Sequence, residues 1–469
     1  MKIEQIYTGC LSQGAYYIES EGEVAIIDPL RSVTPYLEKA AANNARIKYI
    51  FETHFHADFV SGHVTLSKKT GAPIIYGPNA TTSFEAIIAR DGQVFELGNI
   101  SITVLHTPGH TLESAVYLLK DATGKDHAIF SGDTLFLGDV GRPDLAQKTG
   151  SITADDLAGY LFDSLRNKIM PLADDVIVYP AHGAGSSCGK NLSKETVDTL
   201  GNQKATNYAL RANMTKEEFI KEVTEGLTPP PQYFPLNVQM NKEGYEDFAD
   251  VLARSAQALS PAAFESAAND TEAVVLDVRH QDDFSKGHVP RSIFIGLEGG
   301  FAPWVGALIA DVKQPLLLIA PEGMEAEAIT RLSRVGFDQV LGYLKGGFDA
   351  WKKASKEYDT VSSIAATTFD SLNTPEEVPV FDVRKEGEFL SEHVIDAQNT
   401  PLQSLNQHLT AFPEKATFYV HCAGGYRSMI AASILKNRGI HNFIDIAGGF
   451  SAIKETAIPI SDFVCPSTL

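Results

Sequence analysis

An internal repeat in the second half of the chain constrains the fold more than any other feature. VVLDVR at 274–279 recurs as VFDVR at 380–384, and LKGGFDAW at 344–351 recurs as IAGGFSAI at 446–453. Each pair lies about 100 residues apart, so the repeating unit is large enough to be a small domain. Within each unit, short apolar runs alternate with helix-like stretches, the pattern of βα units on a parallel sheet. We therefore predict two related α/β domains.

The first half of the chain has a different arrangement of strands. The runs at 15–20 and 24–29 predict a hairpin, and later β-rich runs end in loops that carry histidine or aspartate. Thr215 and Glu218 have the spacing of a capping box, which predicts the start of a helix. The predicted domains span residues 1–245, 260–356 and 360–469.

Composition and charge narrow the class of protein. The chain has 469 residues, and its 39 Lys and Arg against 59 Asp and Glu give a net charge of −20. We expect no nucleic acid or anionic membrane as a partner, because proteins that bind them present positive surfaces. The polar start, MKIEQIY, is unlike a signal peptide, and the widely spaced cysteines are typical of a reducing compartment. We expect a cytoplasmic protein. The four cysteines are Cys10, Cys188, Cys422 and Cys465.

Histidines and aspartates follow several predicted strands of the first half. THFHAD places two imidazoles at alternate positions, from which both can reach one centre. Later strands lead into PGH, GD and PAH, and strand ends at one sheet edge can bring such side chains together. This combination predicts a metal site. The candidate residues are His54, His56, Asp58, His110, Asp133 and His182.

THFHAD, TPGHT, SGDTLF and GRPDL resemble the metallo-β-lactamase superfamily, and within it the persulfide dioxygenases most. The resemblance covers about residues 1–245 and implies an αββα sandwich. It also implies that His54, His110 and Asp133 bind the metal, a 2-His-1-carboxylate set suited to non-haem Fe(II). The remaining candidates, His56, Asp58 and His182, would then lie next to these ligands and hold them in position without binding the metal.

Two residues in these motifs bear on metal number and substrate. The related glyoxalase II thioester hydrolases carry HxHxDH and hold two metals, whereas here Phe59 follows Asp58. One Fe(II) per chain is therefore favoured over two. Arg142 in GRPDL is a candidate contact for acidic groups of a thiol carrier, since a guanidinium matches carboxylates and phosphates.

A second chemical motif, HCAGGYRS, lies in the last domain. Cys422 follows a predicted strand and precedes a helix, so loop N–H groups and Arg427 can stabilise its thiolate. The Cys-x4-Arg spacing resembles a rhodanese, whose loop holds a cysteine persulfide. Aligned by the GGF segments, the first repeat has Ala320 and Glu325 at these two positions, which implies an inactive rhodanese-like domain. The residues expected to bind the anion are Ala423, Gly424, Gly425 and Tyr426.

Together these motifs resemble the bacterial persulfide dioxygenase–sulfurtransferase fusions. The resemblance implies oxidation of a low-molecular-weight thiol persulfide by O2 to sulfite and thiol, and transfer of sulfane sulfur through Cys422 to sulfite, giving thiosulfate. We also expect a homo-oligomer. One alternative is a zinc-dependent thioester hydrolase of the glyoxalase II type fused to a sulfurtransferase, which Phe59 disfavours. Another is a non-catalytic sulfur relay or scaffold, which the metal set and Cys422 disfavour.

Overall fold

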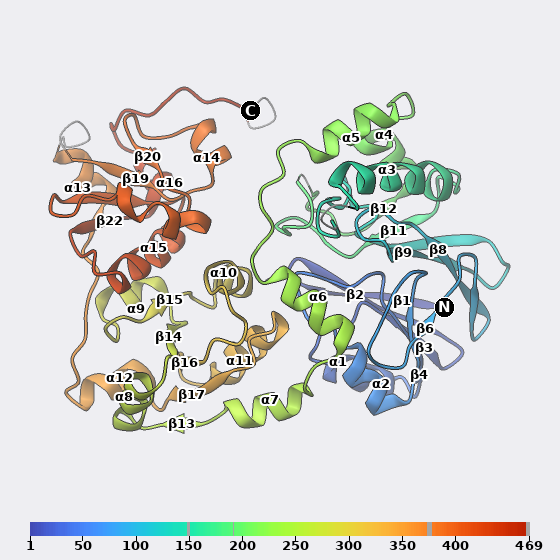
Figure 1. Cartoon of the computed structure of the whole chain (residues 1–469), viewed down its shortest axis with the longest axis horizontal. Helices are drawn as coiled ribbons and strands as arrows, with labels where there is room; N and C mark the ends of the chain where they lie inside the picture. The colour runs from blue at the N-terminus through green and yellow to red at the C-terminus, as the bar shows by residue number, and fades with distance from the viewer. Residues whose placement is uncertain (148–150, 191, 373–377, 466–469) are drawn as a thin grey trace. The chain divides into compact units, whose positions relative to one another are not determined.

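The computed structural model describes residues 1–147, 151–190, 192–372 and 378–465 (Figure 1). The chain divides into two compact units. One contains residues 1–251 with 332–336, and the other contains residues 252–331 with 337–469. No helix in the described part of the chain has the length and apolar character needed to cross a membrane.

The first unit contains two six-stranded sheets, each with neighbours in chain order. The predicted hairpin is confirmed, because β2 and β3 pair antiparallel with Tyr16 opposite Ile27. The first sheet consists of β1 (Lys2–Thr8), β2 (Gln13–Ser20), β3 (Glu23–Ile27), β4 (Arg46–Phe51), β5 (Ile74–Tyr76) and β6 (Ile87–Ile88). The second consists of β7 (Val94–Leu97), β8 (Ile100–His106), β9 (Ala115–Lys120), β10 (Asp126–Gly132), β11 (Ile177–Pro180) and β12 (Asp198–Thr199).

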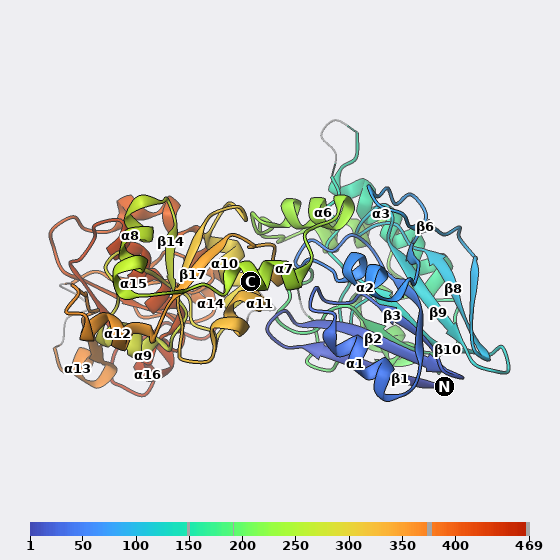
Figure 2. The ribbon, with the colours of Figure 1, turned by 90° about the horizontal axis from the view of Figure 1, so that it is seen from below.

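Helices cover the outer faces of both sheets, so the predicted αββα sandwich is confirmed. Alternation along β2 shows the layering: Tyr16 and Ile18 pack in the core between the sheets, whereas Ala15 and Tyr17 pack in the core that contains Tyr36 of α1. Figure 2 shows α1 and α2 over the first sheet. The helices are α1 (Thr34–Ala42), α2 (His63–Thr70), α3 (Ala154–Ser164), α4 (Leu200–Thr206), α5 (Lys216–Thr224) and α6 (Phe234–Glu243), with a π-helical turn at Leu165–Ile169, a 3-10 turn at Tyr208–Leu210 and α7 (Phe248–Ser255) in the connection to the second unit.

The predicted helix start at Thr215 is also confirmed. The Thr215 hydroxyl accepts a hydrogen bond from Glu218 N at 3.2 Å, and the Glu218 carboxylate accepts one from Thr215 N at 2.8 Å. This reciprocal pair satisfies two N–H groups that a helix start leaves open. Helix α5 then packs beside α3 on the outer face of the second sheet, where Phe219 and Leu161 join one core.

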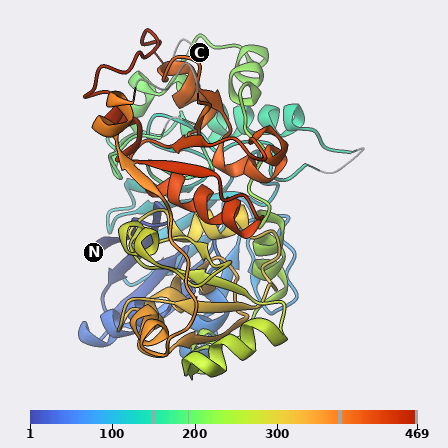
Figure 3. The same cartoon turned by 90° about the vertical axis from the view of Figure 1, so that its left-hand side faces the viewer.

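The second unit contains two five-stranded parallel sheets of identical strand order, which confirms the predicted pair of α/β repeats (Figure 3). In that order the first sheet consists of β13 (Ala258–Leu259), β17 (Val340–Leu344), β16 (Leu316–Ile319), β14 (Val274–Asp277) and β15 (Ile293–Phe294). The second consists of β18 (Ser363–Ala365), β22 (Phe443–Ala447), β21 (Phe418–His421), β19 (Val380–Asp382) and β20 (Gln398–Asn399).

Helices follow the strands of both repeats as the βα pattern predicts. The first repeat has α8 (Pro261–Asp270), α9 (Gln281–Lys286), α10 (Phe301–Leu308), α11 (Glu325–Arg334) and α12 (Gly347–Lys353). The second has α13 (Ala366–Ser371), α14 (Glu386–Ser391), α15 (Tyr426–Asn437) and α16 (Gly449–Ile453), with 3-10 turns at Leu402–Gln407 and Leu409–Ala411. Ala320 directly follows β16, and Cys422 directly follows β21. Each of these strands is the central one of its sheet, so both positions lie at the middle of a sheet edge.

Candidate functional site

Three strand ends bring the predicted metal ligands together. His54 lies in the loop after β4, His110 in the loop after β8, and Asp133 directly after β10; all three are buried. The Nε2 atoms of His54 and His110 lie 3.9 and 3.4 Å from Asp133 Oδ2. One ligand atom from each residue lies within 4.8 Å of the others, so a single ion can contact all three.

The donor atoms fit a metal, because their other interactions leave them open. His54 Nε2 and Asp133 Oδ2 are buried and have no hydrogen-bond partner among the described residues, a costly arrangement unless a cation satisfies them. Burial, together with the charge of His56, lowers the pKa of His54 well below its usual value, which favours the neutral imidazole that binds metals. Burial would raise the pKa of Asp133, but His182 outweighs it and holds the pKa of this carboxyl well below its usual range.

Hydrogen bonds also fix the tautomers of both imidazoles. The Arg142 carbonyl can only accept, so the His110 Nδ1 atom 2.8 Å away carries the proton. The Thr53 hydroxyl donates to Asp28 Oδ2 at 2.9 Å and therefore accepts from His54 Nδ1 at 3.0 Å. Both Nε2 lone pairs are thereby left for a metal.

A second cluster lies beside the first. His182 bridges two carboxylates, with Nε2 at 2.8 Å from Asp58 Oδ2 and Nδ1 at 2.8 Å from Asp133 Oδ1. His56, Asp58 and His182 also offer one ligand atom each within 4.8 Å of one another, so this cluster is itself a possible metal site that adjoins the three predicted ligands. Phe59 is fully buried, with its ring centroid 4.3 Å from that of His56. An apolar ring therefore stands beside this cluster, where the glyoxalase II motif would supply another imidazole.

The loop that carries Cys422 begins where β21 ends. Cys422 is 1% exposed, and its Sγ accepts a hydrogen bond from Gly425 N at 3.1 Å. Gly425 has a φ of +100°, which a residue with a side chain rarely adopts, so glycine allows the loop to curl around the sulfur. Gly449 is needed for the same fold, since a Cβ there would lie 2.3 Å from the Cys422 carbonyl oxygen. Ala423 and Gly424 complete the turn into α15.

Arg427 has a partner that the sequence motif did not reveal. Its guanidinium forms two hydrogen bonds with the Glu388 carboxylate of α14, at 2.6 and 2.8 Å. Burial would raise the pKa of Glu388, but Arg427 outweighs it and lowers the pKa. The pair holds the arginine in a fixed position beside the loop.

Comparisons with known proteins agree with the folds that carry these two groups of residues. The model of the metallo-beta-lactamase superfamily matches residues 8–182, and that of the rhodanese-like domain matches residues 260–354 and 366–456. A crystal structure of a metallo-beta-lactamase from Staphylococcus aureus subsp. aureus COL is 30% identical with a TM-score of 0.67, covering 73% of this chain and 99% of that chain. The chain belongs to the metallo-β-lactamase superfamily. Two rhodanese-like domains follow the metallo-β-lactamase domain.

Other relatives cover less of the chain. A probable hydroxyacylglutathione hydrolase from Schizosaccharomyces pombe is 29% identical over 204 residues, which are 42% of this chain and 75% of that protein. A crystal structure of ETHE1 from Myxococcus xanthus is 27% identical with a TM-score of 0.44 and covers 52% of this chain and 98% of that chain.

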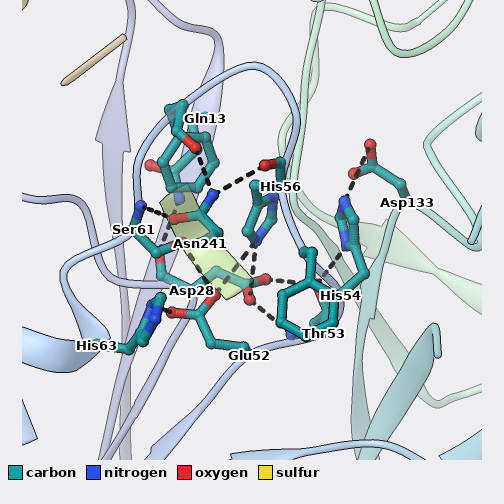
Figure 4. A network of polar contacts seen from close by, with 12 residues as sticks. Gln13, Asp28, Glu52, Thr53, His54, His56, Ser61, His63, Asp133 and Asn241 are labelled. Carbon is teal, nitrogen blue, oxygen red and sulfur yellow. Dashed lines mark hydrogen bonds and ion pairs between the residues drawn. The ribbon is translucent and has the colours of Figure 1, made fainter. Parts of the chain in front are cut away.

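The loop after β4, residues 52–62, carries His54 and His56, and we call it the metal loop. Buried residues that the sequence motifs did not indicate hold this loop in place (Figure 4). His56 Nε2 lies 3.1 Å from Asp28 Oδ1 and 3.6 Å from Glu52 Oε2, and Glu52 Oε1 lies 3.1 Å from His63 Nδ1. Burial and the charge of Asp28 raise the pKa of Glu52 well above its usual value, which favours a proton on this buried carboxyl. The sequence signals for these supporting residues are their positions: Asp28 directly follows β3, and Glu52 directly precedes THFHAD.

Asn241 of α6 holds the same loop from another side of the domain. Its amide nitrogen donates to the carbonyls of His56 and Phe59, both at 2.8 Å, and its oxygen accepts from Ser61 N at 2.9 Å. One buried side chain thus binds three backbone groups of the metal loop (Figure 4). A single asparagine about 180 residues from the motif gives no signal in the sequence.

Arg142 lies at the edge of the metal site, with a guanidinium that is already engaged. It donates to both oxygens of Asp144, at 2.6 and 2.8 Å, and to the carbonyls of Ser187 and Thr228. Gly141 before it must be glycine, since a Cβ there would lie 2.0 Å from Asp133 O. GRPDL therefore orders the loop that carries the Arg142 carbonyl to His110. A contact between Arg142 and a thiol carrier stays a prediction.

Proposed function

We propose that this chain is a non-haem Fe(II) persulfide dioxygenase joined to a thiosulfate-forming sulfurtransferase. In the first reaction a low-molecular-weight thiol persulfide, O2 and water give sulfite and the free thiol, with the terminal sulfur oxidised and O2 reduced. In the second, Cys422 transfers sulfane sulfur from another persulfide to sulfite, which gives thiosulfate and a second free thiol. The observation that carries the proposal is an open 2-His-1-carboxylate site on the same chain as a cysteine sulfur loop.

The metal site supports the oxidation half through its donor set. His54, His110 and Asp133 would hold the ion, and a bound Fe(II) would act as a Lewis acid toward sulfur and activate O2. Three protein ligands leave coordination positions for substrate and O2. The chain's own residues keep both imidazoles in the ligand tautomer through Thr53 and the Arg142 carbonyl.

The loop around Cys422 supports the transfer half. The thiolate would attack the terminal sulfur of the donor persulfide, so that a new S–S bond forms, the donor S–S bond breaks and the donor leaves as a thiolate that takes up the proton of the transferred sulfur. Sulfite would then attack the terminal sulfur held on Cys422, restoring the thiolate and releasing thiosulfate. Gly425 N–H, 3.1 Å from Sγ, and the loop N–H groups around it would stabilise the negative charge in both steps.

A zinc-dependent thioester hydrolase is the second candidate. It is favoured by the 29% identity with the probable hydroxyacylglutathione hydrolase. Phe59 argues against it, because a hydrolase of this type uses a second metal and the apolar ring offers no ligand atom.

Metal content and oxygen uptake distinguish these candidates. Protein purified without oxygen should contain close to one iron per chain and should consume O2 when glutathione persulfide is added. His54→Ala, His110→Ala and Asp133→Ala should each lose iron and O2 uptake, whereas sulfur transfer at Cys422 should remain. Two zinc ions per chain with hydrolysis of a hydroxyacylglutathione thioester and no O2 uptake would overturn the dioxygenase proposal.

A further inference from the structure

Helix α15, which follows the Cys422 loop, is buried on every side. Residues 428–435 are all buried, and their sequence, SMIAASIL, is apolar or small around the whole helix. A helix of this kind must be covered on more than one face. One face packs on β21 and β22 of its own repeat, and another packs on β15 of the first repeat (Figure 1).

Specific hydrogen bonds fix this contact between the repeats. Phe294 N of β15 donates to Ser433 Oγ at 3.0 Å, in the middle of α15. At the end of the helix, the Asn437 side chain donates to the Arg291 carbonyl at 2.7 Å. The inactive repeat therefore supplies backbone partners for the helix that begins at the active loop.

A third contact lies at Tyr426, the first residue of α15 and the direct neighbour of Gly425 in the loop. The Tyr426 hydroxyl donates to the Gly296 carbonyl at 2.8 Å, and its ring meets Phe294 edge-on with centroids 5.9 Å apart. Gly299 leaves the space for this ring, because a Cβ there would lie only 2.2 Å from Tyr426 Cζ. Phe294, Gly296 and Gly299 thus form a socket for Tyr426.

The two residues that follow Gly425 are both held in place, and the socket holds the first of them. Tyr426 is held by the first repeat, and Arg427 is held by Glu388 of the second. These two anchors fix the start of α15, and with it the Gly425 N–H that points at Cys422 Sγ. A shift of Tyr426 would move this N–H group out of line with the sulfur.

We propose that the inactive rhodanese-like repeat is a positioning part of the sulfur-transfer site, with Tyr426 as the positioning residue and Gly299 as the floor of its socket. The inference rests on the proposed sulfur transfer at Cys422. It explains why a repeat without a nucleophile packs on the helix of the active loop rather than serving only as a connection.

Gly299→Ala in the full chain tests the socket directly. The added methyl group must displace the Tyr426 ring, and a displaced loop should lower kcat for sulfur transfer from thiosulfate to cyanide by roughly 10- to 100-fold. The rate at which iodoacetamide alkylates Cys422, followed on its peptide by mass spectrometry, should change as well. Gly387→Ala is the matched control, because a Cβ there meets no described atom within 4 Å; its kcat and alkylation rate should equal those of the wild type.

Tyr426 variants show whether the effect passes through this side chain. Tyr426→Phe keeps the ring and removes one hydrogen bond, so we expect a smaller loss of kcat, about 3- to 10-fold. In a Tyr426→Ala background, Gly299→Ala should cause no further loss, since the ring it displaces is gone. Additive losses in this double variant would overturn the inference.

The two proposals fail in distinguishable ways. A wild-type chain without sulfur transfer would overturn the proposed function, while the alkylation rates would still test the socket. Sulfur transfer and alkylation at wild-type rates in both Gly299→Ala and Tyr426→Phe would overturn the positioning role and leave the proposed function standing.

Discussion

The two rhodanese-like repeats share a framework although only one retains a cysteine. Asp277 and Asp382 are fully buried, and each binds the arginine two residues later through both carboxylate oxygens. Arg279 and Arg384 each donate to a backbone carbonyl eight residues further on, at 2.8 Å in both repeats. The DVR segment that reveals the repeat is therefore a structural clamp, which agrees with its presence in the copy that has no cysteine.

The repeats differ in the loop after the central strand. Gly347 approaches the Ala320 carbonyl as Gly449 approaches the Cys422 carbonyl, so the alignment of these two loops holds in three dimensions. The first repeat lacks the sulfur atom there and has Glu325 where the second has an arginine. Fold and chemistry are thus separable: the clamp and the glycines hold the sheet edge, while Cys-x4-Arg supplies the reactivity.

The clamps should produce the largest effect, and an equal one in both repeats. Asp277→Asn and Asp382→Asn each leave a largely buried guanidinium without its charge partner, so each should lower the free energy of unfolding of its repeat by about 3–5 kcal/mol. The two tryptophans, Trp304 and Trp351, both lie in the first repeat, so their fluorescence reports its unfolding in denaturant.

Loss of sulfur transfer in denaturant reports the second repeat. Asp277→Asn should shift the fluorescence midpoint, and Asp382→Asn should shift the loss of sulfur transfer by a similar amount. An Asp382→Asn protein as resistant to denaturant as the wild type would show that the clamp is not a shared structural element.

Arg427→Glu makes the active loop resemble the inactive one and should cost the next largest effect. The new carboxylate would face Glu388 and repel both the Cys422 thiolate and sulfite, so kcat/KM for sulfur transfer should fall by at least about 100-fold. Arg427→Lys keeps the charge but loses the paired hydrogen bonds and should lose less. Equal losses in the two variants would mean that the charge of Arg427 does not matter.

A buried carboxyl on β22, that of Asp445, predicts that pH changes the stability of the second repeat, by less than the substitutions above. Asp445 accepts a hydrogen bond from Ser363 Oγ at 3.0 Å, and burial raises the pKa of Asp445 to about 6. Because the folded state binds this proton more tightly than the unfolded state, its stabilising contribution is full below about pH 4 and is lost as the pH rises through 6.

The second repeat should therefore lose about 1 kcal/mol of this contribution between pH 5 and pH 7. Asp445→Asn should remove that part of the pH dependence in denaturation followed by sulfur transfer. The first repeat has Tyr343 at the matching position of β17, which pairs with Ala258 as Asp445 pairs with Ser363. A wild-type pH dependence that persists in Asp445→Asn would assign it to another group.

Ala320→Cys should have the smallest effect, namely none on sulfur transfer. In a Cys422→Ser background the new thiolate would lie in a loop with Glu325, whose like charge disfavours it. Only the addition of Glu325→Arg is expected to yield measurable transfer. Activity from Ala320→Cys alone would show that the arginine is dispensable in this fold.

Sequence patterns predicted two kinds of element, namely those that recur along the chain and the strands that are followed by candidate metal ligands. The two parallel sheets and the capping box at Thr215 follow from local spacing, the αββα domain follows from the family resemblance, and His54, His110 and Asp133 do meet in space. The spacing predictions succeeded because each rests on residues close together in the chain, and the ligands meet because β4 of one sheet and β8 and β10 of the other end at the same edge of the sandwich.

The supporting contacts could not be predicted, because they join residues far apart in the chain. Asn241 reaches the metal loop from α6, Glu388 reaches Arg427 from α14, and Gly296 accepts from Tyr426 across the two repeats. A single asparagine, glutamate or glycine has no periodicity or motif of its own. Arg142 shows the converse: its motif was visible, but only the structure shows that its side chain is engaged within the domain.

The sulfur product of Cys422→Ser tests the central claim most directly. The substitution leaves the metal ligands intact, so O2 uptake with glutathione persulfide should continue at the wild-type rate. A serine hydroxyl is too weakly acidic to accept sulfane sulfur, so sulfite should accumulate in the variant, whereas the wild type should release mainly thiosulfate. Chromatography of the sulfur anions, with protein-free mixtures as the control for the spontaneous reaction, measures this ratio. Equal thiosulfate from both proteins above that control would contradict the two-step account.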